Sequence, residues 1–133
     1  HAFDICSFTQ IVISSSITSI FEGTLRECSS LDEIIIPSSV TSIGYDVFYN
    51  CSSLKQVTIH SSVTSIGSFA FSICSAFEKI TIPTSITMIK EGTFKNCSSL
   101  TQISIHFSVI CHIFFIILPW KKLARRKLES DLH

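Results

Sequence analysis

The feature that most constrains this chain is an internal repeat with a period of 23 residues. Cysteines recur at positions 28, 51, 74 and 97, and the apolar residues between them keep the same spacing. Full copies cover residues 28–50, 51–73 and 74–96. A copy one residue shorter begins at Cys6, and a fifth opens at Cys97 and loses the pattern after residue 106. Repeats of this length are typical of solenoids, in which each copy forms one structural unit.

Each copy has two chemically different halves. The first half has the Ile-x-Ile alternation of a short strand with one buried face, and Pro37 ends it because proline cannot donate a hydrogen bond to a sheet. The second half, through Gly44 to Phe48, predicts a short extended piece, a turn at the glycine, and one helical or 3-10 turn that carries the phenylalanine inward. Asn50 and Asn96 are expected to close this turn in the left-handed conformation.

One copy alone is not expected to fold. Burial of roughly seven apolar side chains stabilises a copy by less than the ordering of its backbone and side chains costs. Stacked copies share a core and pair their strands edge to edge, so we expect a solenoid of at least three coils. Its strands form a curved parallel β-sheet, with short extended and helical or 3-10 turns on the other side. We assign 1–106 to the solenoid, 107–120 to an apolar segment and 121–133 to a basic tail.

The repeat pattern L-x-x-I-x-I-P-x-S-V-T-S-I-G-x-x-x-F-x-x-C closely resembles the BspA-like leucine-rich repeat of bacterial and protist surface proteins, over about Cys6 to His106. The resemblance implies a leucine-rich-repeat solenoid at the cell surface. Adhesion to host or matrix proteins is the usual role of that family, and the resemblance does not carry over a binding specificity. The departures from the pattern are Phe8 and Phe77 for leucine, Leu25 for phenylalanine, and Lys90 for glycine.

A binding surface, if the solenoid has one, is expected on the strand residues that alternate with the buried isoleucines. Such a ladder resembles the concave recognition face of leucine-rich repeats, and it is equally consistent with a plain solvated sheet face. Glu33, Gln56 and Lys79 lie in the middle of the ladder and are expected to matter most. Coil by coil, the candidate residues are Gln10 and Val12, Glu33 and Ile35, Gln56 and Thr58, Lys79 and Thr81, Gln102 and Ser104.

Four of the six cysteines share one position in the repeat and should therefore stack as a ladder. We expect buried thiols that act as small apolar side chains. Disulfides between neighbouring coils would require their Cβ vectors to turn toward each other, which parallel stacking disfavours. A metal site is disfavoured further, because the chain has no C-x-x-C motif and no Cys-His pairing that supplies tetrahedral ligands.

Two other residue types fit both a structural and a functional interpretation. His60 and His106 occupy the position that proline holds in other copies, where a polar residue at a strand end is the expected role. Asn50 and Asn96 each begin an N-x-S sequon. We interpret both first as turn-closing residues; glycosylation would require passage through a eukaryotic secretory route.

Charge and motif content narrow the function classes. The formal net charge is zero, and the basic residues of the repeats are scattered, so no nucleic-acid footprint is present. No paired carboxylates, nucleophile and base, phosphate loop or metal cluster interrupts the repeat, so we predict no enzyme and no cofactor. The preferred function is a surface module that binds a protein ligand, and the alternative is an intracellular scaffold that mediates protein–protein interaction.

The end of the chain departs from the repeat. Residues Phe107 to Trp120 are almost wholly apolar, and the basic stretch KKLARRK follows. One interpretation is a single-pass anchor with the repeats outside and the C-terminus cytoplasmic, so that Phe107 to Lys127 contacts the membrane. Another is a capping coil, with an apolar strand over 109–118 and a helix that opens at Pro119. A third is an extension from a disrupted reading frame.

The start of the chain shapes two further expectations. It reads HAFDIC, without the charged and apolar regions of a signal peptide. Because the first copy starts almost at once, we expect a fragment of a longer array from a cell-surface or secreted protein. Its open coil ends would expose apolar surface and an unpaired strand, which favours self-association.

Overall fold

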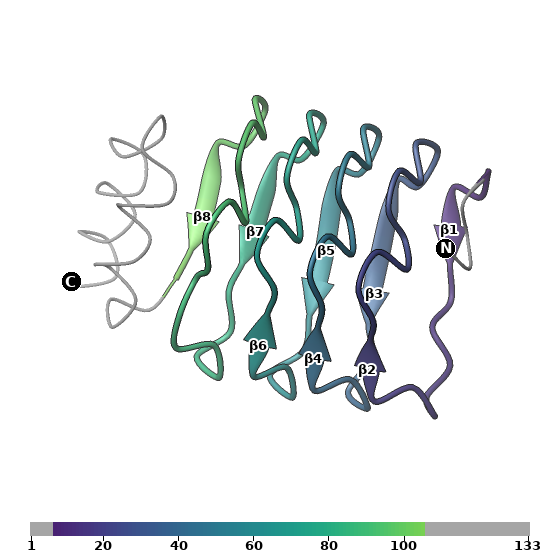
Figure 1. Cartoon of the computed structure of the whole chain (residues 1–133), viewed down its shortest axis with the longest axis vertical. Coiled ribbons are helices and arrows are strands. Elements are labelled where there is room, and N and C mark those ends of the chain that lie inside the picture. Colours follow the sequence, from purple (N-terminus) through teal and green to yellow (C-terminus); the bar gives the residue numbers. More distant parts are fainter. Residues whose placement is uncertain (1–6, 106–133) are drawn as a thin grey trace.

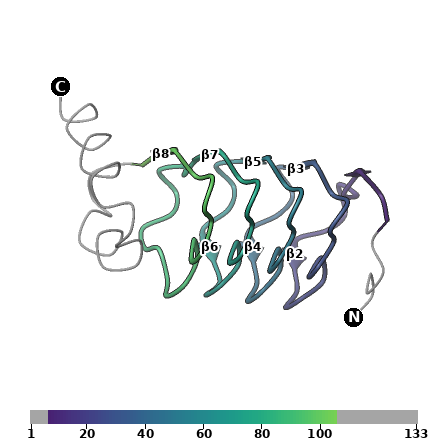
Figure 2. The same ribbon diagram turned by 90° about the horizontal axis from the view of Figure 1, so that it is seen from above.

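The computed structural model describes residues 7–105, which wind into the stacked coils of a solenoid (Figure 1). We number the coils from the N-terminus: coil 1 is 7–27, coil 2 is 28–50, coil 3 is 51–73, coil 4 is 74–96, and coil 5 is 97–105. Every coil contributes one strand to a large sheet, and coils 1 to 3 each contribute a second strand to a small sheet. The two rows of strands occupy different sides of the stack (Figure 2).

Both sheets are parallel, and neighbouring strands are in register at the repeat spacing. The large sheet has the order β1 (Gln10–Ile11), β3 (Glu33–Ile36), β5 (Gln56–Ile59), β7 (Lys79–Thr81), β8 (Gln102–Ser104). The small sheet has the order β2 (Ser19–Ile20), β4 (Ser42–Ile43), β6 (Ser65–Ile66). The predicted parallel sheet of short strands is thus confirmed, and the extended piece in the second half of each copy proves to be a sheet of its own.

The predicted helical or 3-10 turn does not form in residues 7–105. Phe48 and Asn50 instead donate their amides to carbonyls of coil 3, each at 2.8 Å, while Tyr49 and Cys51 donate to carbonyls three residues earlier, at 3.1 and 3.2 Å. Backbone amides on this turn side therefore alternate between local turns and bonds to the next coil. A helical turn would direct all of its amides back along its own chain, so stacking replaces the helix with a series of turns.

The alternation depends on residues in the left-handed conformation at two positions of each turn. Asn50 and Asn96 have φ of 55° and 59°, which confirms the prediction that they adopt it. Ile73 holds the same position with φ of 60°, although a β-branched side chain is poorly suited to it. Four residues earlier in the repeat, the same conformation occurs at Gly23, Asp46, Phe69 and Gly92.

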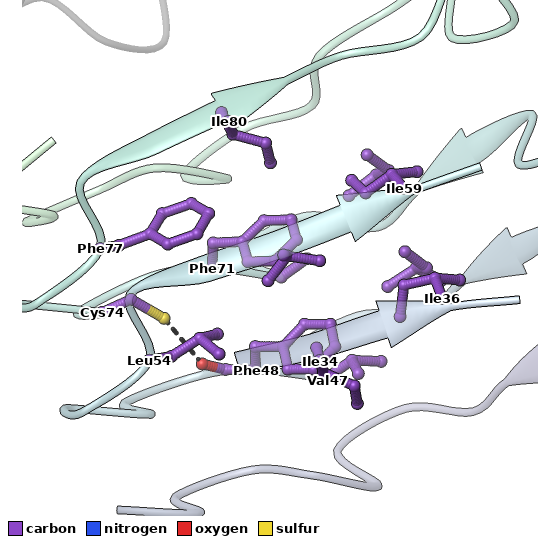
Figure 3. Close-up of a cluster of buried hydrophobic side chains, with 14 of the residues drawn as sticks. Ile34, Ile36, Val47, Phe48, Leu54, Ile59, Phe71, Cys74, Phe77 and Ile80 are labelled. Atoms are coloured by element: carbon purple, nitrogen blue, oxygen red, sulfur yellow. Dashed lines mark hydrogen bonds between the residues drawn. The ribbon is translucent and has the colours of Figure 1, made fainter. Parts of the chain in front are cut away.

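Aromatic rings stack inside the hydrophobic core, and Figure 3 shows Phe48, Phe71 and Phe77 among the buried side chains. Phe48 and Phe71 stack with ring centroids 5.2 Å apart, and Phe71 also stacks on Phe94 at 5.8 Å. Phe77, which replaces the leucine of coils 2, 3 and 5, packs against Phe71 at 5.3 Å. This departure from the repeat pattern therefore keeps apolar volume inside the core.

The four cysteines of the repeat are fully buried thiols, as predicted. Cys74 Sγ donates to the carbonyl oxygen of Phe48 at 3.0 Å (Figure 3), and Cys97 Sγ donates to that of Phe71 at 2.9 Å. A hydrogen bond with the Cys97 thiol, together with burial, raises the pKa of Cys74 well above the ordinary thiol value. The Cys74 thiol therefore favours its neutral form, and the thiols of Cys51, Cys74 and Cys97 each donate to a carbonyl 26 residues earlier in the chain.

A glycine column sets how closely the coils approach beside the small sheet. A Cβ atom on Gly67 would lie 2.5 Å from the backbone of Gly44 and Tyr45, so only glycine fits. Lys90 stands at this position in coil 4, and there residues 88–89 form no strand with β6.

In the large sheet, β5 and β7 are in register only at Gln56 and Lys79, whereas β3 and β5 pair at four positions.

Candidate recognition surface

The predicted binding residues form two rows on the outer face of the large sheet. Nine of the ten are exposed, and Ser104 is half-buried. The first row consists of Gln10, Glu33, Gln56, Lys79 and Gln102, which are in register from strand to strand. The second row consists of Val12, Ile35, Thr58, Thr81 and Ser104. Their placement matches the prediction; a role in binding stays a prediction.

Two shallow hollows lie along this outer face. The first lies over β5, β7 and β8, where the register between β5 and β7 is reduced, and it is lined by both rows in coils 3 to 5. The second lies over β1 and β3, and it is lined by Gln10, Val12, Glu33 and Ile35 together with parts of the strands beneath them.

The second row makes the two ends of the face chemically different. Val12 is 95% exposed and Ile35 is 69% exposed, so two large apolar side chains stand in solvent over β1 and β3. Thr58, Thr81 and Ser104 follow in the same row over β5, β7 and β8. The outer face therefore changes from apolar to polar along the solenoid axis.

The first row carries two charges of opposite sign. Gln10 Nε2 donates to Glu33 Oε1 at 3.5 Å, a long hydrogen bond from a neutral group. Within residues 7–105, neither Glu33 nor Lys79 forms a salt bridge, because the ion pairs found there join Arg26 to Glu27 and Asp46. Within this part of the chain, both charges of the face therefore lack an oppositely charged partner.

The outer face of the large sheet has different residues at equivalent positions, whereas the small sheet has the same residues at the same positions in three coils. Its flanking threonine donates its Oγ1 to the previous coil, from Thr41 to the carbonyl of Thr18 at 3.1 Å and from Thr64 to that of Thr41 at 3.2 Å. Ser42 Oγ donates to Ser19 Oγ at 3.0 Å. The exposed residues here repeat because their side chains bond the coils together. On the turn side the exposed positions vary, as on the outer face.

Sequence reasoning missed one interaction on the turn side. Arg26 Nη1 lies 3.3 Å from Asp46 Oδ2 in the next coil, and the guanidinium lies 4.6 Å from the centre of the Tyr49 ring. Burial raises the pKa of Asp46, the charge of Arg26 opposes that shift, and Glu22 adds to it. These residues occupy positions that differ between copies, so the repeat pattern gave no signal for the contact.

The remaining sequence candidates are placed as follows. His60 Nδ1 accepts the amide of Ser62 at 3.1 Å, so the ring supports the turn after β5. Asn50 is half-buried and Asn96 is exposed, and their glycosylation stays a prediction. Among the described residues, no group of three or more His, Cys, Asp and Glu side chains could hold a metal ion.

Several predictions fall outside residues 7–105. They concern Cys6, His106, the apolar segment Phe107 to Trp120, and the basic tail with its membrane contact through Lys127. In the part of the chain that the structure describes, no helix is long and apolar enough to cross a membrane.

The parallel strands, the turn on the opposite side and the period of 23 residues define a leucine-rich-repeat solenoid. The sequence matches the family described as the BspA type leucine rich repeat region over residues 1–115, with six copies. The chain belongs to this family, as the repeat pattern predicted. A comparison with curated proteins finds no match.

Solved structures support the fold. A leucine rich cell surface protein from Faecalibacterium prausnitzii is similar with a TM-score of 0.76 and 29% identity, over 81% of this chain. A leucine-rich repeat protein from Bacteroides ovatus is similar with a TM-score of 0.60 and 26% identity, over 80% of this chain. The chain spans 29% and 34% of the length of these two proteins.

Proposed function

We propose that this chain is a non-enzymatic binding module of a cell-surface protein, and that it adheres to a protein ligand of host or matrix type through the outer face of the large sheet. The proposal rests on the family membership and on the likeness to a structure described as a leucine rich cell surface protein. Leucine-rich repeats in general present an extended sheet surface that suits protein recognition.

The observation that carries the proposal is a difference between the two sides of one strand. The inward rows hold isoleucine or valine in every coil because the core requires it. The first outward row alternates glutamine with one glutamate and one lysine, and the second changes from Val to Ile to Thr to Ser along the solenoid. Within residues 7–105, the hydrogen bond that links these side chains to another coil is the long one between Gln10 and Glu33. Side chains that the fold does not need are the ones available for recognition.

The test uses the full chain immobilised on a biosensor and a panel of purified matrix proteins: fibronectin, laminin and collagen. We expect at least one of them to bind the wild type. The triple variant Glu33→Ala, Gln56→Ala, Lys79→Ala should reduce that binding by about tenfold or more, because mid-surface residues contribute most of the affinity.

A matched control changes three exposed residues away from this face, Lys90→Ala, Glu91→Ala and Lys95→Ala, and should leave binding unchanged. Circular dichroism would verify that both triple variants are folded. If the wild type binds none of the panel, the adhesion proposal fails and an intracellular scaffold becomes the function to test. If both triple variants bind like the wild type, recognition lies on another side of the solenoid.

A further inference from the structure

We propose that the outer face recognises a protein segment with two opposite charges: a basic group beside an apolar side chain over β1 and β3, and an acidic group about 10 Å away over β7. This inference rests on the proposed function and names the chemistry of its ligand. It is carried by the positions of Glu33, Lys79, Val12 and Ile35 on one continuous surface.

The basic and apolar part of the ligand fits the hollow over β1 and β3. Val12 and Ile35 are the two most exposed apolar side chains on this face, and such a patch is stabilised when another apolar group covers it. Glu33 lines the same hollow, and within residues 7–105 the hydrogen bond to its carboxylate is the long one from the amide of Gln10 at 3.5 Å. A Lys or Arg side chain, with an apolar stem and a cationic end, matches both features.

The acidic part of the ligand fits the hollow over β5, β7 and β8. Lys79 lines it, and the side chains around the lysine are uncharged hydrogen-bonding groups: Gln56, Thr58, Thr81, Gln102 and Ser104. A carboxylate placed here would gain a charge-assisted hydrogen bond from Lys79. The amides and hydroxyls nearby would provide further donors.

Register fixes the separation of the two charges. Glu33 pairs with Gln56, and Gln56 pairs with Lys79, so the charges lie two strands apart on the same row. Adjacent strands are about 4.8 Å apart, which places the two side chains about 10 Å apart across an uncharged glutamine. An extended peptide that crosses the strands covers this distance with about three residues.

The presence of a carboxylate, an apolar patch and a lysine on one face discriminates between classes of ligand. A polyanion such as a nucleic acid would meet the carboxylate of Glu33 at one end of the face, and a polycation would meet Lys79 at the other. A protein segment can place a basic, an apolar and an acidic side chain within a few residues. The ligand class that fits is therefore a mixed-charge peptide or loop.

The experiment selects random twelve-residue peptides displayed on phage against the immobilised full chain. We expect the enriched peptides to contain Lys or Arg next to an apolar residue, with Asp or Glu about three residues away. A synthetic peptide of the enriched sequence should bind the charge-swap variant Glu33→Lys/Lys79→Glu about tenfold or more weakly. This swap leaves net charge unchanged, so a loss cannot come from the overall field.

The control variant is Glu91→Lys/Lys95→Glu, in which both changed residues lie on the turn side. It should bind the peptide as tightly as the wild type does. A third variant, Val12→Ser/Ile35→Thr, should weaken binding while both charges remain. The inference is overturned if no peptide is enriched, if the peptides lack the charge pair, or if the charge swap on the outer face has no effect. The enriched peptides could instead lack the charge pair and bind the triple alanine variant of the preceding section more weakly than the wild type. In that case the charge-pair inference fails, and the proposed recognition face is retained.

Discussion

The junction between coils 2 and 3 and the junction between coils 3 and 4 use the same core and differ in their sheets. At the first junction, β3 and β5 pair at four positions, β4 and β6 pair, and Gly67 lies against the backbone of Gly44. At the second, the large sheet keeps one register pair and the small sheet ends. The turn side is unchanged, since Phe69, Phe71 and Ile73 all donate to coil 4.

The two junctions differ at one position of the repeat, Gly67 or Lys90, and we expect this position to control how closely two coils stack. In the first junction a glycine removes the Cβ that would separate the coils, and in the second Lys90 supplies one. The phenylalanine column crosses both junctions, with ring separations of 5.2 and 5.8 Å. The core and the turn side therefore keep the same contacts across a junction where the small sheet ends and the pairing in the large sheet is reduced.

The largest effect is expected from Phe71→Ala. Its ring is fully buried and stacks on Phe48 in coil 2 and on Phe94 in coil 4, so its loss weakens both junctions. We expect the free energy of unfolding to fall by about 3 to 5 kcal/mol, measured by urea denaturation. Phe8→Ala is the matched control, because Phe8 is 60% exposed, and it should cost far less. Equal losses would contradict the central role of the ring column.

The next largest effect tests the junction between coils 2 and 3. In Gly67→Ala, the new Cβ would meet backbone atoms of Gly44 and Tyr45, and such overpacking costs about 1 to 3 kcal/mol. Lys90→Ala changes the same repeat position in coil 4, where a Cβ is already present, and should be nearly neutral. If the two alanine variants were equally stable, close approach at the glycine column would not explain the difference between the junctions.

A smaller effect tests the junction between coils 3 and 4 directly. In Lys90→Gly, coil 4 can approach coil 3, and the amide of residue 90 should donate to the carbonyl of Ile66, as Gly67 donates to Ile43 at 2.8 Å. The new bond is offset by the flexibility of glycine, which costs about 0.5 to 1 kcal/mol, so stability should change by less than about 1 kcal/mol. Amide hydrogen exchange should reveal new protection at residue 90. Unchanged exchange there would show that Lys90 is not what holds the sheets apart.

The smallest effect concerns pH and the link between coils 1 and 2. The pKa of Asp46 is raised, so the folded state binds the proton of this carboxyl group more tightly than the unfolded state does. The contribution of Asp46 to the free energy of unfolding therefore falls as the pH rises above about 4, the ordinary pKa of an aspartate. Asp46→Asn should remove that decline, and asparagine tolerates the φ of 61° found here. Urea midpoints between pH 3.5 and 7 would measure it. A steeper decline in the variant would show that the Arg26 contact dominates.

The sequence predicted most of what depends on the repeat itself. Register follows from the spacing, so the two outer rows from Gln10 to Gln102 and from Val12 to Ser104 could be identified before the structure. Asn50 and Asn96 signalled left-handed turns because asparagine tolerates them. The cysteine ladder followed from the same spacing.

What could not be predicted depends on contacts between coils. The small sheet was missed because two-residue strands such as Ser42–Ile43 exist only when a neighbour pairs with them. The helical turn was wrong because local preference gave way to bonds with the next coil. Lys90 was recognised as a departure, but the close backbone approach at this repeat position, which occurs at Gly67, involves atoms of another copy. Arg26 and Asp46 meet at positions that the repeat leaves variable.

The direction of the hydrogen bonds has a consequence for how such a chain can change in length. On the turn side, coil 2 donates to coil 3, as from Phe48 to Ala70; beside the small sheet, coil 3 donates to coil 2, as from Gly67 to Ile43. One flat side of a coil therefore carries a pattern of donors and acceptors that complements its other flat side. A coil inserted or deleted as a whole 23-residue unit leaves matching surfaces in contact. The copy that begins at Cys6 is one residue shorter, and Gln10 is still in register with Glu33, so a change of another length keeps the match where it lies outside the paired segments. An array of this kind can therefore gain or lose complete turns without altering the contacts between the coils that remain.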